Sequence, residues 1–225
     1  MIAVPNKLTE IDLEIALAEL SARDADLARL YTELGKPPMW ARNPGFSTLI
    51  RIILEQQVSL ASARAAFERL LASASPLTPE SFLALHDTAL ARIGFSRQKM
   101  AYGRYLAQSI AEGRFDLDKL DLMDDETAKA RLIELKGIGP WTADIYLLMA
   151  LRRPDAWPAG DLGLIQAVQD VKRLPSRPNP ETMVAIAEIW RPWRAVAARM
   201  LWHHYLSRLF NRPANGNPRS ALPDV

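Results

Sequence analysis

The stretch Leu135-Lys-Gly-Ile-Gly-Pro-Trp-Thr-Ala143 is the most informative part of the chain, and Pro158-Ala-Gly-Asp161 follows it closely. Gly137 and Gly139 predict a turn too tight for side chains, because glycine alone enters positive φ without a steric cost. Pro140 stands where a helix would begin, since its fixed φ suits the first turn and its missing N–H needs no partner there. The pattern predicts a helix, a glycine hairpin and a second helix whose first amides can bind a phosphate.

Asp161 comes directly after Gly160 and precedes an apolar run that predicts a helix to about Val171. Two interpretations of this carboxylate are open from the residues alone. Asp161 is either the N-cap of that helix or a functional carboxylate. A phosphate-binding hairpin with a carboxylate placed after it suggests chemistry on nucleic acid.

The composition is that of an ordinary soluble globular protein, with 225 residues, 49% hydrophobic and 24% charged. A chain of this length forms one domain or two closely packed lobes. No apolar run approaches the roughly 18–20 residues that span a bilayer, and residues 1–9 lack the apolar core of a secretory signal. The sequence contains no cysteine, which excludes disulfides, a thiolate nucleophile and cysteine-ligated metals. We expect a cytoplasmic protein that has no contact with a membrane.

Net charge argues only weakly for an anionic partner, because the formal value is +2 at a pI near 9.0. The segment 191–219, however, contains arginines and no acidic residue: Arg191, Arg194, Arg199, Arg208, Arg212 and Arg219. This segment is interpreted either as a solvated basic face or as a contribution to phosphate neutralisation.

Apolar spacing is helical nearly throughout, and no alternating strand pattern appears. We predict an all-α fold of about ten helices, in two packed lobes with the hairpin at the cleft between them. One lobe covers about 35–140, the N-terminal helices and about 141–210 form the other, and 211–225 is a flexible tail of the same single unit. The expected helix starts are Ser47, Ser59, Thr78, Arg97, Asp124, Asp161, Asn179 and Trp193, after one or two opening helices over 11–34.

The hairpin together with Asp161 resembles the helix-hairpin-helix/Gly-Pro-Asp superfamily of base-excision DNA glycosylases. Further blocks resemble its alkylation-repair branch, DNA-3-methyladenine glycosylase II. These blocks are Asn43-Pro-Gly-Phe-Ser-Thr-Leu49, Ile53-Leu-Glu-Gln-Gln-Val-Ser59, Gly94-Phe-Ser-Arg-Gln-Lys99, and Ile189-Trp-Arg-Pro-Trp-Arg194 with Met200-Leu-Trp202. The resemblance covers roughly Pro44 to Leu206. It implies the compact helical form, since about 40 residues before Pro44 leave no room for the β-rich N-terminal domain of two-lobed members.

The resemblance implies that Asp161 is the catalytic carboxylate, which stabilises the positive charge that builds on the sugar as the base departs. Trp141 stands at the hairpin-helix position where the superfamily's lyases carry a Schiff-base lysine, and Lys136 does not match that position. The implied activity is therefore monofunctional hydrolysis that leaves an abasic site. The implied substrates are alkylated purines of the 3-methyladenine and 7-methylguanine type in duplex DNA.

Trp141, Trp202 and Ile145 match positions that line the base pocket, where an aromatic face attracts a cationic alkylated purine. Core packing is the alternative for both tryptophans. Ile145 replaces a tyrosine of the better-known relative. Gln57 matches the wedge that fills the space left by a flipped base. Its alternative is a glutamine pair, Gln56 and Gln57, that caps the turn between two helices.

The expected phosphate contacts are the amides around Gly137, Ile138, Gly139, Trp141 and Thr142. The family also suggests a sodium or potassium ion on the carbonyls of Leu135 and Ile138, although no cofactor is required and no side-chain metal site is expected. His86, His203 and His204 are interpreted as structural. The expected partner of a monomeric protein is damaged double-stranded DNA. Two alternatives are a glycosylase for deaminated or oxidised bases and a non-catalytic hairpin module that binds DNA.

Overall fold

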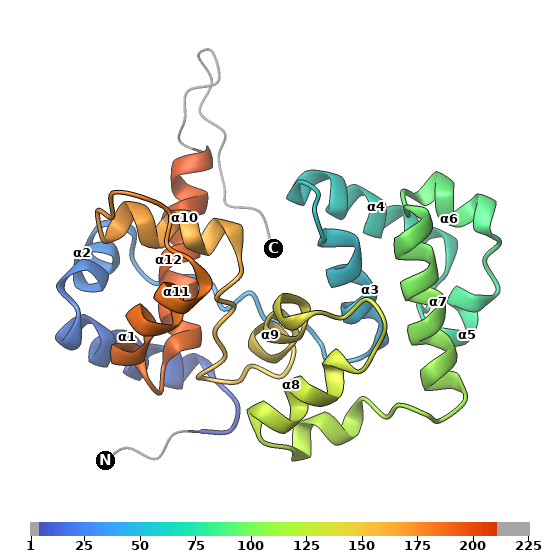
Figure 1. Ribbon diagram of the computed structural model, residues 1–225, viewed down its shortest axis with the longest axis horizontal. Coiled ribbons are helices and arrows are strands. Elements are labelled where there is room, and N and C mark those ends of the chain that lie inside the picture. Colours follow the sequence, from blue (N-terminus) through green and yellow to red (C-terminus); the bar gives the residue numbers. More distant parts are fainter. Residues whose placement is uncertain (1–4, 211–225) are drawn as a thin grey trace, which may run out of the picture. The chain divides into compact units, whose positions relative to one another are not determined.

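The computed structural model describes residues 5–210, and within that range it is helical, with no strand. Twelve α-helices and two 3-10 turns follow one another along the described chain (Figure 1). The predicted all-α class is confirmed. The chain divides into two compact units, which are residues 42–151 and residues 5–41 together with 152–210.

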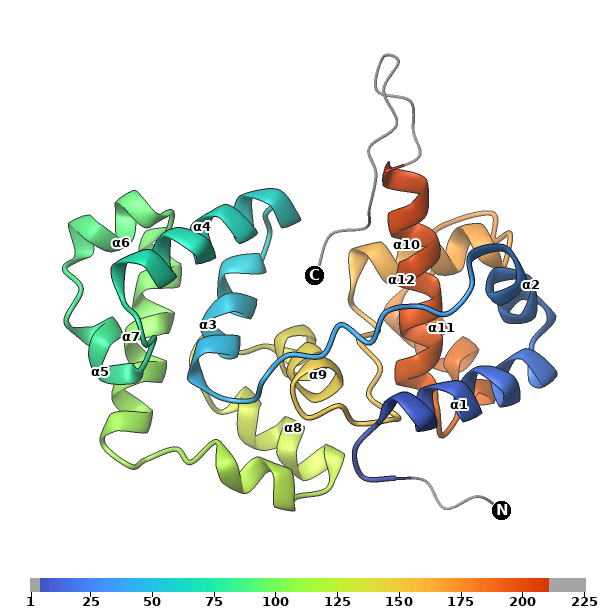
Figure 2. The same cartoon turned by 180° about the vertical axis from the view of Figure 1, so that it is seen from behind.

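The 42–151 unit is built around α3, which packs against α4, α7 and α9 (Figure 2). Leu49, Ile50 and Ile53 of α3 are fully buried and form its core. Its elements are α3 (Phe46–Glu55), α4 (Leu60–Ser73), α5 (Pro79–Leu83), α6 (Asp87–Ile93), α7 (Arg97–Ala111), the 3-10 turn η1 (Asp118–Leu122), α8 (Asp125–Ile133) and α9 (Pro140–Met149).

The other unit is organised by the long C-terminal helix α12, which packs against α10, α2 and α1. Its elements are α1 (Glu10–Arg23), α2 (Ala25–Leu34), α10 (Leu162–Val171), α11 (Pro180–Ala187), the 3-10 turn η2 (Glu188–Trp190) and α12 (Arg194–Phe210). Trp190 and Trp193 are buried within it. Trp190 donates its indole N–H to the buried carboxylate of Asp24 at 2.7 Å, and Lys172 donates to the same group. These contacts hold the C-terminal ends of α1 and α10 together beside the buried Trp190.

Most helix starts lie where the sequence predicts them. Ser59, Thr78, Asp124 and Asn179 are N-caps, and each side chain accepts a hydrogen bond from an amide of the first turn. The prediction of Ser47 as an N-cap is wrong, because α3 begins at Phe46 after Gly45. Gly45 has a φ of 127° and donates its amide to the Tyr146 hydroxyl at 2.8 Å, so a tertiary contact sets this start.

The division between the units falls after Leu151, whereas the sequence predicts it near residue 140. The difference arises because α9 packs on α3 and α8 and therefore belongs with them. The amide of Arg42 donates to the carbonyl of Met149 at 2.9 Å, which joins the two ends of the 42–151 unit. The position of the hairpin at a cleft between lobes stays a prediction, and the predicted tail at 211–225 lies outside the described residues.

Within the described chain, the arginines of the 191–219 segment are bound to other groups of the protein, although Arg191 and Arg208 remain exposed. Arg191 and Arg194 bind Asp155, and Arg208 binds Asp170. Arg199 is fully buried and donates to the carbonyls of Met39 and Ala195. Arg212 and Arg219 lie outside the described residues.

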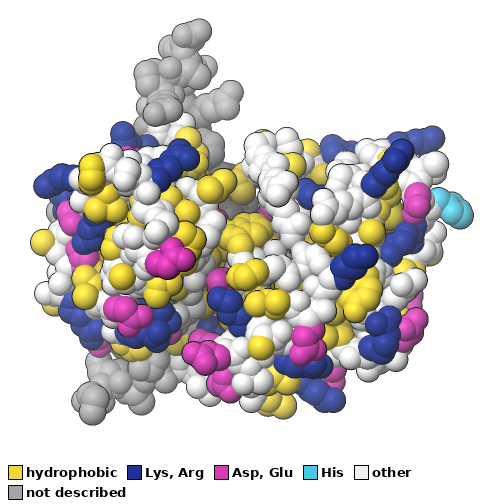
Figure 3. Space-filling model, viewed as in Figure 1, with side chains coloured by type: hydrophobic (Ala, Val, Ile, Leu, Met, Phe, Trp, Pro, Cys, Tyr) yellow, Lys and Arg dark blue, Asp and Glu magenta, His cyan; other side chains and the backbone are white. Residues whose placement is uncertain are grey.

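The surface shown in Figure 3 mixes charges of both signs over both units, without a field of one sign. Among the described helices, none has the length and apolar character needed to cross a bilayer.

Candidate functional site

The glycine hairpin joins α8 to α9, with Gly139 as N-cap and with Pro140 as the first helical residue, as the sequence predicts for Pro140. Gly137 has a φ of 91°, and a Cβ at this position would lie 2.2 Å from Cγ of Tyr102. Glycine is therefore required there by both backbone and packing.

The expectation of positive φ is wrong for Gly139, whose φ is −94° in an extended conformation. A Cβ added to Gly139 would meet nothing within 4 Å. The fold thus places no demand for glycine at this residue. Its missing side chain instead leaves the backbone at the start of α9 open to approach by a ligand.

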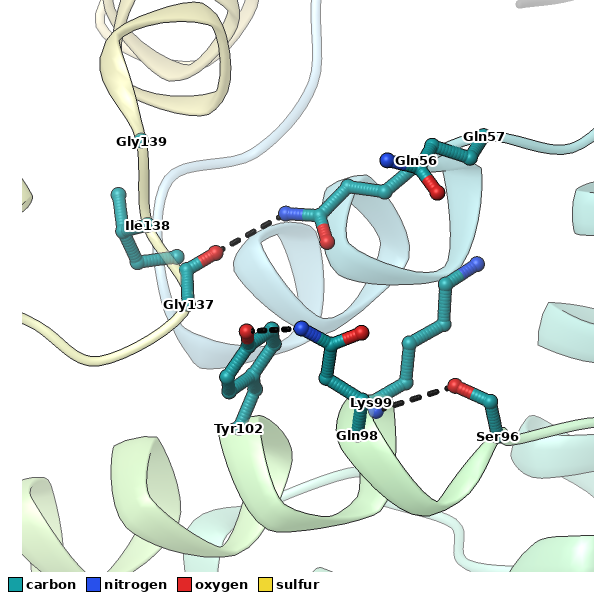
Figure 4. A pocket seen from close by; sticks show the side chains of 9 residues that line it. All are labelled: Gln56, Gln57, Ser96, Gln98, Lys99, Tyr102, Gly137, Ile138 and Gly139. Atoms are coloured by element: carbon teal, nitrogen blue, oxygen red, sulfur yellow. Dashed lines mark hydrogen bonds between the residues drawn. The ribbon is translucent and has the colours of Figure 1, made fainter.

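Gln56 fastens the end of α3 to both arms of the hairpin. Its side-chain amide donates to the carbonyl of Gly137 at 3.0 Å (Figure 4) and to Oγ1 of Thr142 at 3.0 Å. Thr142 is 2% exposed and its hydroxyl is part of this internal bridge, so the predicted phosphate contact of Thr142 stays a prediction.

Gln57 follows with its backbone in the left-handed region, at a φ of 57°, and is exposed. It lines an open pocket of about 410 Å³ together with the hairpin residues Gly137, Ile138 and Gly139. The predicted wedge and three of the predicted phosphate-binding residues therefore meet at one cavity of the 42–151 unit. The remaining lining residues are Gln56, Ser96, Gln98, Lys99 and Tyr102 (Figure 4).

Lys99 is the cationic residue of this pocket and extends from α7 towards the end of α3 (Figure 4). Its ammonium group donates to the carbonyl of Leu54 at 2.7 Å, and burial lowers the pKa of Lys99. Ser96 caps α7 by accepting from the Lys99 amide, and α7 begins at Arg97, where the sequence predicts its start.

Trp141 and Ile145, two of the predicted base-pocket residues, lie on α9. Trp141 is half-buried in the first turn, whereas Ile145 is 3% exposed and packs in the core of the 42–151 unit. Their contact with a base stays a prediction. The carbonyl of Leu135 accepts the Ile138 amide at 3.0 Å within the hairpin. Among the described residues, His, Cys, Asp and Glu side chains form no group of three that could hold a metal ion.

Asp161, in the other unit, lies at the start of α10, where its carboxylate accepts hydrogen bonds from a backbone amide and from an indole. Its Oδ1 accepts the amide of Leu164 at 2.8 Å and the indole N–H of Trp202 at 3.0 Å. The first contact is the N-cap that the sequence allows. The second is more than a cap requires, and it orients the carboxylate against α12.

Trp202, expected to offer an aromatic face, thus also serves as a hydrogen-bond donor. Its ring packs edge-on against Trp40, with centroids 6.4 Å apart and planes at 72°. Trp40 has a φ of 47°, which a bulky residue adopts only where its surroundings impose it. Arg199, one turn before Trp202, anchors the neighbouring carbonyl of Met39 at 2.8 Å. Trp40 thus packs against Trp202, and Trp202 in turn donates a hydrogen bond to Asp161.

Small and apolar residues complete the surroundings of the carboxylate. A Cβ at Gly163 would lie 3.1 Å from Cε1 of Tyr205 and 3.3 Å from Oδ1 of Asp161. The glycine therefore lets α10 approach α12 closely beside Asp161. Leu162, directly after Asp161, is 77% exposed, which places an apolar side chain in solvent next to the carboxylate.

Sequence reasoning missed Trp40 and Gly163 as parts of these two sites, and it considered Gln56 only as part of a glutamine pair that caps the turn between two helices. Gln56 and Lys99 lie inside the blocks that carry the resemblance, which is a signal of importance but not of role. Trp40 and Gly163 have no local signal, because their contacts are with residues far along the chain.

The chain belongs to the HhH-GPD superfamily of base excision DNA repair proteins, which it matches over residues 50–192. It is 30% identical to DNA-3-methyladenine glycosylase 1 of Schizosaccharomyces pombe over 86% of this chain and 89% of that protein. It is 29% identical to the putative DNA-3-methyladenine glycosylase YfjP of Bacillus subtilis, over 78% of this chain but only 64% of that protein's length.

Among solved structures, the chain is similar to the 3-methyladenine DNA glycosylase Mag1 of Schizosaccharomyces pombe in complex with abasic DNA. The TM-score is 0.78 and the identity 28%, covering 83% of this chain and 94% of that one.

Proposed function

We propose that this protein is a DNA glycosylase that hydrolyses the N-glycosidic bond of alkylated purines in duplex DNA and leaves an abasic site. The observation that carries the proposal is Asp161, whose Oδ1 is held by Trp202 and by the amide of Leu164. The names of the relatives, 3-methyladenine glycosylases of a bacterium and a yeast, support the substrate class. The abasic DNA bound by the similar structure supports the product.

The proposed reaction requires from the protein a fixed negative charge and a positioned water molecule. The bond between C1′ and the base nitrogen breaks with its electron pair on the base, and positive charge develops on the sugar. A carboxylate beside C1′ stabilises that charge, and it orients the water whose oxygen bonds to C1′ and accepts the proton that the water releases. Asp161 performs these roles in the proposal, and the hydrogen bonds from Leu164 and Trp202 orient its carboxylate.

We further propose that the activity is hydrolytic only, without a lyase step. A lyase of this family attacks C1′ with a lysine at the position that Trp141 occupies here, and an indole has no nucleophilic amine. Lys136 lies in the exposed hairpin loop, before the matching position. Lys129, on α8, is bound to the buried carboxylate of Asp144 at 2.7 Å.

In the proposal the 42–151 unit grips DNA through the open backbone at Gly139 and the neighbouring hairpin amides. Gln57 enters the stack when the damaged base is flipped out. The hairpin carbonyls of Leu135 and Ile138 are neutral oxygen ligands of the kind that suit a monovalent cation, and they would hold such an ion, whose positive charge would attract a phosphate. The duplex is bound by a monomer in this account.

The selectivity for alkylated purines rests on charge. N-alkylation leaves a purine cationic and weakens its glycosidic bond, so a pocket with an indole face favours these bases by on the order of 0.5–2 kcal/mol. Trp141 and Trp202 supply such faces in the proposal.

The direct test is mass spectrometry of the bases that the purified protein releases from methylated duplex DNA. We expect 3-methyladenine and 7-methylguanine. Release of hypoxanthine or 8-oxoguanine in place of methylated purines would reassign the substrate class. DNA binding with no release of any base would identify a non-catalytic hairpin module.

A further inference from the structure

We propose that Gln56 is a positioning residue that couples the Gln57 wedge to the DNA-gripping hairpin. This inference rests on the proposed function. The one amide group of Gln56 donates to Gly137 O (Figure 4) and to Thr142 Oγ1. Gly137 lies in the turn and Thr142 lies in the first turn of α9, so the bridge holds both arms of the hairpin.

Three successive residues before the wedge are each anchored to a different part of the unit. The carbonyl of Leu54 accepts from Lys99 of α7 at 2.7 Å. The carboxylate of Glu55 accepts from both terminal nitrogens of Arg42 at 2.9 and 2.8 Å. Gln56, the third, reaches the hairpin. The chain is therefore fixed up to the residue that precedes Gln57.

Gln57 itself departs from this anchored segment as a projecting residue. Its φ of 57° is a conformation that a residue with a side chain adopts only where the surrounding structure holds it. The two following apolar side chains, Val58 and Leu60, are 47% and 43% exposed. The turn thus exposes the polar side chain of Gln57 beside the apolar side chains of Val58 and Leu60. Gln56 attaches this turn to the hairpin.

The hairpin side of the bridge is equally rigid. Gly137 lies against the ring of Tyr102, close enough that even a methyl group would overlap it. The Tyr102 hydroxyl in turn accepts a hydrogen bond from the side-chain amide of Gln98 (Figure 4). The turn whose carbonyl accepts from Gln56 is therefore also packed against α7.

This coupling has a consequence for base flipping. Unstacking and unpairing a base costs free energy, which the enzyme recovers from its contacts with the DNA. A wedge tied to the phosphate-binding turn inserts to a depth that the bound phosphate sets. Without the bridge, the hairpin would still bind the backbone, but the wedge would no longer be held at that depth.

The test is a double-mutant cycle with Gln56→Met and Gln57→Ala. Methionine keeps the length of glutamine and removes both donors. Base release from a methylated duplex is measured in single turnovers at saturating enzyme, so that changes in affinity do not contribute. A 2-aminopurine beside the lesion reports unstacking through its fluorescence. Gln108→Met, at an exposed position of α7, is the matched control.

We expect Gln56→Met to slow base release on the order of tenfold and to reduce the fluorescence change, because misplacement of a positioned group can slow a reaction by up to about a hundredfold. The double variant should be no slower than Gln57→Ala alone, and Gln108→Met should match the wild type. Thermal unfolding of each variant verifies that the protein tested is folded.

Multiplicative losses in the double variant would overturn the proposal, because Gln56 would then act independently of Gln57. Unchanged release and fluorescence in Gln56→Met would also overturn it. Failure of the wild-type protein to release any base is a different result, which contradicts the proposed function itself.

Discussion

Trp202 donates its indole N–H to Oδ1 of Asp161 at 3.0 Å, and the same oxygen accepts the amide of Leu164 at 2.8 Å. An aromatic residue expected to stack on a base thus holds the carboxylate that the proposed reaction uses. The ring of Trp202 also packs edge-on against the ring of Trp40, which helps to fix the position of the indole. The carboxylate is therefore oriented by α12 as well as by its own helix.

Trp202→Phe separates the two roles of the indole, because phenylalanine keeps an aromatic face and loses the donor. We expect base release in single turnovers to slow on the order of tenfold to a hundredfold, since the carboxylate loses its fixed orientation. Trp157→Phe is the matched control, because Trp157 donates its indole N–H to Met183 O at 3.1 Å and does not touch Asp161 in the described contacts. Equal rates for Trp202→Phe and the wild type would refute the orienting role.

The two hairpin glycines should respond differently to alanine. Gly137→Ala places a side chain at positive φ and against Tyr102, so we expect a loss of about 3 kcal/mol in the free energy of unfolding. Gly139→Ala should change stability by less than about 1 kcal/mol, since its φ is ordinary and its surroundings are open. Its affinity for duplex DNA should nevertheless fall. Urea denaturation and DNA titration measure the two effects, and equal stability losses would contradict the assignment.

The absence of a lyase step can be checked by borohydride reduction during turnover. A Schiff base between a lysine and C1′ is trapped as a covalent protein–DNA adduct, whereas hydrolysis by water leaves none. We expect no adduct on a denaturing gel, and an intact abasic strand until alkali is added. An adduct formed by the wild-type protein would show that a lysine elsewhere in the chain acts as nucleophile, although position 141 is a tryptophan.

Stability should depend on pH through two histidines of α12. Burial lowers the pKa of His203 and of His204 below the ordinary value of 6.5. The unfolded chain therefore binds protons more readily than the folded one, and stability is lost as pH falls through about 6.5. The unfolding temperature should drop between pH 7 and pH 5, and less so in His203→Leu with His204→Leu. A midpoint that stays constant or rises over this range would contradict the prediction.

Features set by neighbouring residues are the ones that the sequence predicts well. Thr78-Pro79-Glu80 and Asn179-Pro180-Glu181 start helices because a cap and a proline act within one turn. Gly137 is predicted for the same reason, since positive φ is a local property. Ser47 misleads because the hydrogen bond between Gly45 and Tyr146, which are 101 residues apart, moves the helix start.

The same distinction between local and long-range features applies to the candidate site. Asp161 and the hairpin are found from the sequence because motif spacing carries them. Gln56 and the hairpin are joined over 81 residues, and Trp202 and Asp161 over 41, so no local pattern indicates these hydrogen bonds. Trp40 shows the limit most clearly, because its backbone conformation is imposed by contacts with α12 that only the fold brings together.

The measurement that tests the central claim most directly is base release by Asp161→Asn, compared with the wild type on methylated duplex DNA. Asparagine is an equally good N-cap, and its carbonyl oxygen can accept from Leu164 and Trp202, so the fold should be retained. We predict that the variant still binds abasic DNA and that released 3-methyladenine falls to the uncatalysed background. Release at the wild-type rate would contradict the assignment of Asp161 as the catalytic carboxylate.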